Sequence, residues 1–175
     1  MLGGISGDRY ATGVEKFAAI PNSPAYYTLS PSGNYLITNN KTIYRYDGTL
    51  FINQGVMPAS FKPEQRFAFA ANDDIIGTFH PDAGGPTQIM AYDITTRSLK
   101  YSVEVAEQSV EKLLLDPISK KILVDLWDTS YLLDPETQKL TYLGSNITSL
   151  HNGKLFAQHF RGPDYVYVID ASVYE

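Results

Sequence analysis

One pattern recurs four times along this 175-residue chain, and it constrains the fold more than any other feature. Each copy has an apolar strand, a polar turn, a second strand, a loop and a third strand that ends in aspartate. The final aspartates are Asp47, Asp93, Asp134 and Asp170, spaced by roughly 40 residues. This spacing predicts a repeated supersecondary unit rather than one irregular domain.

The three strands of each copy follow one template. They are expected at 27–29, 35–38 and 42–47; at 59–61, 67–70 and 88–93; at 113–115, 121–124 and 130–134; and at 147–150, 154–158 and 165–170. Each aspartate also opens a polar turn toward a fourth strand, most clearly at 99–103 and 140–143, because Asp can bond its own backbone two residues on. Residues 106–112 have the composition of a short helix, but the repeat template predicts that the first strand of the third copy starts at Val110. The template is the stronger signal.

Four short antiparallel strands in about 40 residues are typical of a β-propeller blade. We therefore predict an all-β, propeller-type single domain over 1–175, with about four four-stranded antiparallel blades. Their approximate bounds are 24–56, 57–106, 107–145, and 146–175 completed by 10–20. The last copy lacks a fourth strand, while Val14 to Ile20 reads as a strand without a blade. Two arrangements stay open: closure by pairing of these two ends, or membership of a larger ring completed by a second copy or by further chain.

The turns Ser30-Pro31-Ser32-Gly33 and Asp134-Pro135-Glu136-Thr137 give the chain a family likeness. It resembles the YVTN-type, tryptophan–aspartate-type and quinoprotein-type blade repeats, without distinguishing among them. Tryptophan–aspartate repeats end the third strand with Trp-Asp, whereas Trp127-Asp128 lies out of that register, so we interpret this dipeptide as coincidence. The resemblance implies the architecture and no particular activity.

Composition excludes several function classes. The net charge of −5 and the lack of a basic run argue against a nucleic-acid surface. Cysteine is absent, which excludes thiolate nucleophiles and sulfur-based zinc sites. No apolar run could span a bilayer, and no signal peptide is visible in the opening residues. These features favour a soluble cytoplasmic protein without fixing its compartment, and no cofactor is indicated.

The strand order predicts that loops after the second strands share one irregular rim, opposite a rim of generic turns. Loops on a rigid sheet often carry function. The candidate binding residues on the irregular rim are Asn39, Asp73, Asp74, His80, Asp82, Trp127, Asp128, His159, Arg161 and Asp164.

Each candidate also has a structural explanation. The acidic residues and His80 of the 72–86 insertion could collect a divalent cation, but their spacing matches no ligand pattern, and a loop packed over its own apolar residues is favoured. Trp127 could anchor a partner, although packing between blades is the favoured interpretation. His159 could titrate near neutral pH, yet nothing pairs it with a nucleophile, so a structural role is favoured. No metal site is predicted.

These observations predict a non-catalytic binding or scaffold module whose irregular rim binds a protein or peptide. The alternative is a propeller enzyme or carbohydrate-binding domain with a site at the rim or central axis, for which no catalytic signature such as Gly-x-Ser-x-Gly is present. The expected core comprises Leu29, Leu36, Ile43, Phe61, Phe67, Phe69, Leu114, Ile122, Leu132, Leu150, Leu155, Val166 and Val168.

Overall fold

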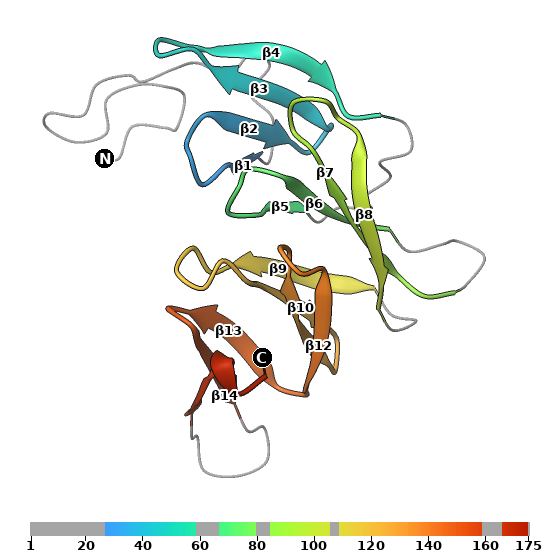
Figure 1. The fold of residues 1–175 in the computed structure, drawn as a ribbon, viewed down its shortest axis with the longest axis vertical. Coiled ribbons are helices and arrows are strands. Elements are labelled where there is room, and N and C mark those ends of the chain that lie inside the picture. The colour runs from blue at the N-terminus through green and yellow to red at the C-terminus, as the bar shows by residue number, and fades with distance from the viewer. Residues whose placement is uncertain (1–26, 59–66, 80–84, 106–108, 159–165, 175) are drawn as a thin grey trace, which may run out of the picture. The chain divides into compact units, whose positions relative to one another are not determined.

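The computed structural model describes residues 27–58, 67–79, 85–105, 109–158 and 166–174. These ranges contain fifteen strands and one turn of 3-10 helix, η1 (Ala171–Tyr174). The strands form four antiparallel sheets that follow one another in chain order (Figure 1). The predicted all-β, propeller-type fold class is confirmed, and no helix in the described ranges exceeds one turn.

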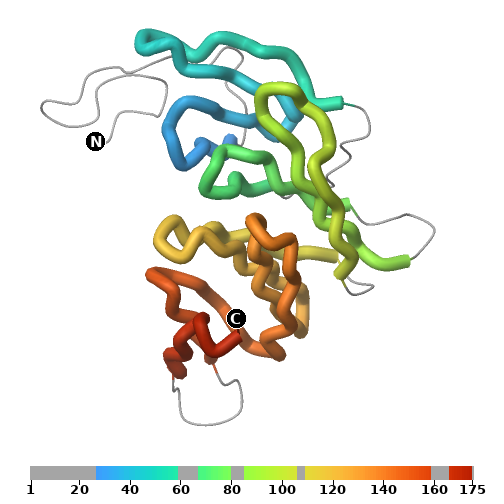
Figure 2. Tube along the Cα trace, viewed as in Figure 1, coloured from blue at the N-terminus to red at the C-terminus, as the bar shows by residue number. Residues whose placement is uncertain are grey.

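Every sheet is a meander, in which each strand pairs with the strand that precedes it in sequence. Figure 2 shows the chain running back and forth through one sheet before it enters the next. The first sheet has β1 (Tyr27–Leu29), β2 (Tyr35–Thr38), β3 (Thr42–Tyr46) and β4 (Phe51–Val56); the second has β5 (Phe67–Phe69), β6 (Ile75–Phe79), β7 (Gln88–Tyr92) and β8 (Leu99–Glu104). The third has β9 (Val110–Leu115), β10 (Ile122–Leu126), β11 (Ser130–Asp134) and β12 (Lys139–Gly144); the last has β13 (Ile147–His151), β14 (Lys154–Gln158) and β15 (Val166–Asp170).

The chain divides into two compact units, Met1–Pro58 and Ala59–Glu175. The first unit carries the first sheet, whose buried cluster consists of Leu36, Tyr44 and Phe51. The second unit carries the other three sheets. The division lies close to the predicted end of the first blade.

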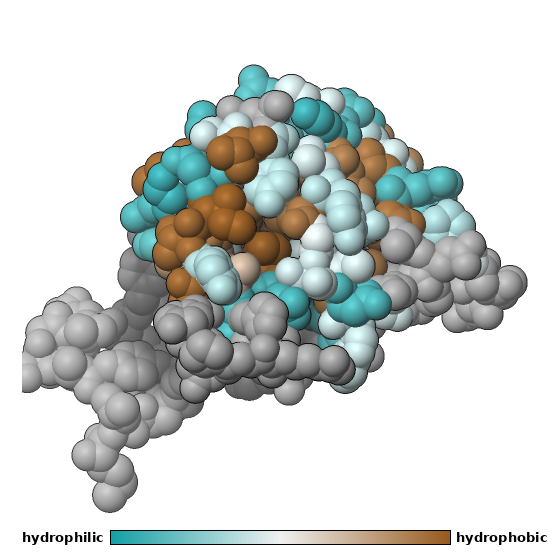
Figure 3. Space-filling view, turned by 90° about the horizontal axis from the view of Figure 1, so that it is seen from below, coloured by the Kyte–Doolittle hydropathy of each residue, from teal (hydrophilic) through white to brown (hydrophobic). Residues whose placement is uncertain are grey.

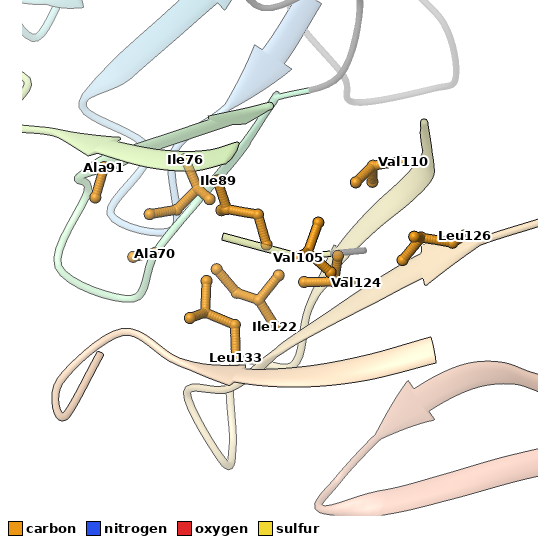
Figure 4. Packing of buried hydrophobic residues seen from close by; sticks show 10 residues of the cluster. All are labelled: Ala70, Ile76, Ile89, Ala91, Val105, Val110, Ile122, Val124, Leu126 and Leu133. Atoms are coloured by element: carbon orange, nitrogen blue, oxygen red, sulfur yellow. The ribbon is translucent and has the colours of Figure 1, made fainter. Parts of the chain in front are cut away.

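Within the second unit, the sheets pack face to face through side chains that alternate along the strands. Ile76, Ile89 and Ala91 of the second sheet meet Ile122, Val124 and Leu133 of the third (Figure 4). The opposite face of the third sheet presents Leu123 and Leu132 to Leu150 and Leu155 of the last. The first strand of the third sheet, β9, contacts both β5 and β13, which are the first strands of its neighbours. Sheets stacked through their faces and first strands are the arrangement of propeller blades.

The recurring aspartates cap the turns that lead into the fourth strands. The Oδ1 of Asp47 accepts the N–H groups of Thr49 and Leu50, at 2.8 and 2.9 Å. Asp93 and Asp134 repeat this geometry in the second and third sheets. The aspartate recurs because it satisfies two backbone donors that the tight turn would otherwise leave unpaired.

The predicted strand order of the second sheet is wrong. Phe67–Phe69 is its first strand, not its second, and the expected insertion contains the central strand β6. Both Ile75 and Ile76 are fully buried in that strand, so they belong to a sheet and not to a loop. The expected first strand at 59–61 lies outside the described residues.

Of the thirteen predicted core residues, seven are buried and five are not. Leu29, Val166 and Val168 are exposed, and Phe67 and Leu114 are only half-buried. Leu29 lies on β1 and the two valines on β15; both are edge strands, which have a neighbour on one side only. Phe61 lies outside the described residues, and the remaining predicted core residues are buried: Leu36, Ile43, Phe69, Ile122, Leu132, Leu150 and Leu155.

The last sheet presents an apolar edge. β15 pairs with β14 alone among the described strands, and its residues Val166, Tyr167 and Val168 are exposed. Hydrophobic side chains gather on the face seen in Figure 3. An exposed apolar edge strand tends to pair with another strand.

None of the described residues forms a helix long and apolar enough to cross a membrane.

Candidate binding site

The β10–β11 hairpin of the third sheet displays the single tryptophan of the chain. Leu126 is buried in the core, and its N–H donates to the carbonyl of Thr129 at 2.8 Å, which closes the hairpin. Trp127 follows directly and is 86% exposed, beside the exposed Asp128. The favoured packing of Trp127 between blades is therefore wrong, because Leu126 occupies the inward position and the hairpin tip carries Trp127 into solvent.

Polar contacts hold the base of this hairpin against the last sheet. The Ser130 hydroxyl is buried, lies 2.9 Å from Oδ1 of Asp125 and is 3.3 Å from the carbonyl oxygen of Ile147. Lys112, which pairs with Asp125 across β9 and β10, donates from Nζ to the carbonyl of Thr148 at 3.1 Å. These contacts join the base of the hairpin that carries Trp127 to the last sheet.

The carboxyl of Asp125 is the titratable group behind the tip. Burial raises its pKa, the hydrogen bond from Ser130 and the charge of Lys112 oppose that rise, and the charge of Glu111 adds to it. Since its partners are the groups that join the two sheets, Asp125 supports the hairpin in the described structure.

The predicted acidic pair of the second sheet lies at the other end of its sheet. Asp73 and Asp74 belong to the β5–β6 turn, because β6 starts at Ile75, and so they lie at the turn end and not at the irregular rim. Asp74 is buried and accepts hydrogen bonds from Nζ of Lys100 at 2.5 Å and from Nδ2 of Asn72 at 2.8 Å. These partners give Asp74 a structural role. Asp73 has a φ of 67°, which suits the turn.

The other predicted residues are not gathered into one site. Asn39 is exposed in the β2–β3 turn and belongs to the first unit. His80, Asp82, His159, Arg161 and Asp164 lie outside the described residues. Among the residues that are described, no group of three or more His, Asp or Glu side chains could hold a metal ion.

Sequence reasoning missed a cleft at the turn end of the third sheet. Its volume is about 760 Å³, and three lysines, Lys120, Lys121 and Lys139, contribute to its lining. Two of the turns that build it, β9–β10 and β11–β12, were expected to be generic, and the third, β5–β6, was expected to open the insertion of the irregular rim. Each turn was visible in the sequence, but their convergence is a property of the stacked sheets.

The fold and these sites define an all-β protein of propeller type, and comparison with known proteins agrees with the fold. No protein-family model matches the chain, and no curated protein matches it. Among solved structures, the chain resembles the hydrazine synthase of Kuenenia stuttgartiensis at 15% identity with a TM-score of 0.56, over 94% of this chain and 50% of that one.

A second similar structure is the extracellular domain of a protein described as a one component system from B. thetaiotaomicron. The identity is 11% and the TM-score 0.50, over 81% of this chain and 21% of that one. The chain thus spans about half the length of the first structure and about a fifth of the second. At these identities the likeness concerns the fold alone.

Proposed function

We propose that this protein is a non-catalytic binding module that recognises a protein or peptide through the loop end of its third sheet. The observation that carries the proposal is Trp127, 86% exposed at the tip of a hairpin whose strands bear the buried Leu126 and Ser130. Exposing a tryptophan to water is unfavourable, and tryptophan is enriched among the residues that dominate binding energy in interfaces.

The shape of the hairpin favours a macromolecular partner. Trp127 protrudes at a tip and is not among the residues that line the cleft. Small ligands are bound in concave sites, whereas a protruding aromatic ring suits insertion into a partner's pocket. Asp128 beside it would place a negative charge at the rim of such a contact. Charges at a rim contribute to specificity and to the association rate more than to affinity.

Trp127 also reports on its own binding, because it is the only tryptophan. Peptides selected from a random library on the immobilised protein should shift the tryptophan emission to shorter wavelength and protect it from iodide quenching. Trp127→Ala should weaken their binding by at least about thirtyfold, the effect of losing roughly 2 kcal/mol at an interface hot spot. Fluorescence anisotropy of labelled peptide measures the dissociation constant.

Ile118→Ala is the matched control. Ile118 is 69% exposed in the turn at the opposite end of the same sheet, so its loss removes exposed apolar surface without touching the proposed site. Its binding should stay within about twofold of the parent. Selected peptides that bind Trp127→Ala as tightly as the parent would contradict the proposal, and saturable quenching by oligosaccharides in their place would favour the carbohydrate-binding alternative.

A further inference from the structure

The cleft at the turn end of the third sheet has the size of a small-molecule site. Ligand pockets commonly occupy about 300–1,000 Å³, and this cleft has a volume of about 760 Å³. Ala70 and Ala71 of the β5–β6 turn, Leu132 of β11 and Tyr174 of η1 supply apolar walls. Because these residues come from the second sheet, the third sheet and η1, the cleft exists only in the assembled second unit.

A row of charges crosses one face of the sheet at this point. Asp134 pairs with Lys139 across β11 and β12, and the register that pairs Ile122 with Leu133 brings Lys121 beside Asp134 from the other side. Lys120 lies next to this row in the β9–β10 turn. Three lysines and Asp134 therefore contribute to the lining of one cleft.

The carboxylate of Asp134 already accepts hydrogen bonds within its own turn. Its Oδ1 accepts the N–H groups of Glu136 and Thr137, at 2.9 and 3.2 Å. Burial opposes ionisation of Asp134, but these hydrogen bonds and the charge of Lys121 lower its pKa. With Glu136 as the other acidic residue of the lining, the cleft has a net positive charge in a chain whose overall charge is −5.

Two of the cleft lysines, Lys120 and Lys139, differ from the other described lysines of the second unit outside the cleft. Lys100 and Lys154 form ion pairs with Asp74 and Asp170, and Lys112 donates to a backbone carbonyl. In the described part of the chain, Lys120 and Lys139 form no side-chain hydrogen bond or ion pair. Their ammonium groups are thus available at the cleft, and lysine binds phosphate and carboxylate groups as a mobile point charge.

We propose that this cleft binds a small organic polyanion, a molecule with two or more carboxylate or phosphate groups. Lys120, Lys121 and Lys139 would neutralise the anionic groups, and Leu132 and Tyr174 would contact the carbon skeleton. The site lies at the end of the third sheet opposite Trp127, so it is independent of the proposed peptide-binding function.

Calorimetric titration with citrate and with fructose 1,6-bisphosphate tests the proposal and distinguishes carboxylate from phosphate ligands. The parent should bind at least one probe saturably, with an affinity that falls as salt is raised. The double variant Lys120→Gln/Lys139→Gln should bind that probe about tenfold more weakly, since two charge-assisted contacts are lost. Unchanged thermal unfolding of the variant shows that the loss is local.

Lys41→Gln is the matched control. Lys41 and Lys120 both have a left-handed backbone, with φ of 65° and 62°, so both substitutions remove one charge at the same backbone cost. Lys41 belongs to the first unit, outside the cleft. Its variant should bind within about twofold of the parent. Equal weakening by Lys41→Gln, or no binding of either probe by the parent up to about 10 mM, overturns the proposal.

Discussion

Replacing Asp116 with alanine is expected to lower the free energy of unfolding by about 2–4 kcal/mol, because it leaves several backbone donors unpaired. Asp116 is 1% exposed and joins two sheets. Its Oδ2 accepts the Gly153 N–H at 2.7 Å and its Oδ1 accepts the Asn152 N–H at 3.0 Å, both from the β13–β14 turn. The Ser119 hydroxyl, in its own turn, donates to Oδ2 at 2.7 Å.

The turn that Asp116 reaches needs such an acceptor. Asn152 and Gly153 form a two-residue hairpin connection in which both have positive φ, 50° and 69°. Tight connections of this kind favour Asn-Gly, and they leave central N–H groups free to bond outside the hairpin. The Asp116 carboxylate therefore fixes the last sheet against the third, and denaturant titration of the variant should show an unchanged m-value with a lower midpoint.

Asp93→Ala separates this contact between sheets from ordinary turn capping. Asp93 caps its own turn through the N–H groups of Thr95 and Thr96, and it is exposed to solvent enough for water to replace it. We expect a loss below about 1 kcal/mol for this variant. Equal losses for the two variants would mean that the bonds from Asp116 to the last sheet add nothing to stability.

The stabilising effect of Asp116 should also depend on pH. Burial opposes its ionisation, but hydrogen bonds from Ser119, Gly153 and Ile118 lower its pKa from 3.8 to about 2. A lowered pKa contributes stability above the unfolded value that is lost as pH falls through the folded one, here about 2 kcal/mol. The stability gap between the parent and Asp116→Asn should be full at about pH 6 and should shrink toward about pH 2. A gap that is constant with pH would contradict this.

Local chemistry explains which parts of the fold could be predicted from the sequence. The aspartate that ends each third strand bonds N–H groups two and three residues on, so its role is contained in a few consecutive residues. In the second sheet, polar segments precede both Phe67 and Ile75, and either could be the first turn of the template. Used alone, the template took the polar segment before Phe67 as the first turn, and it therefore assigned Phe67–Phe69 as the second strand of the sheet instead of the first. The branched, apolar run of β6 was the signal for a central strand.

The exposure of Trp127 and the position of the cleft could not be predicted from the sequence, because both depend on contacts between residues that are distant along the chain. The exposure of Trp127 follows from Leu126 taking the inward position beside an irregularity in the β9–β10 pairing. The cleft depends on turns separated by about 60 residues along the chain and brought together by stacking of the sheets. Alternation within a strand predicts which face a side chain occupies, but not which face another sheet will cover.

Removing residues 1–20 is expected to lower the melting temperature by about 10 °C or more and to promote self-association. β15 pairs with β14 alone among the described strands, and it exposes Val166, Tyr167 and Val168. The first three sheets each have a fourth strand at the corresponding position. Residues 14–20 read as a strand without a blade, so they are the proposed partner of β15, although they lie outside the described residues.

Deletion of residues 1–9 is the control for this truncation, because it spares the predicted strand and should leave the melting temperature unchanged. Light scattering of the full chain distinguishes the two sources of the strand, since pairing within one molecule gives a monomer and pairing with a neighbouring copy gives an oligomer that the longer deletion disrupts. Either source protects the edge of β15, because a paired strand no longer presents free N–H and C=O groups to other chains. If the protein without residues 1–20 stays monomeric and as stable as the parent, the opening segment does not pair with β15, and the apolar edge is covered by something other than these residues.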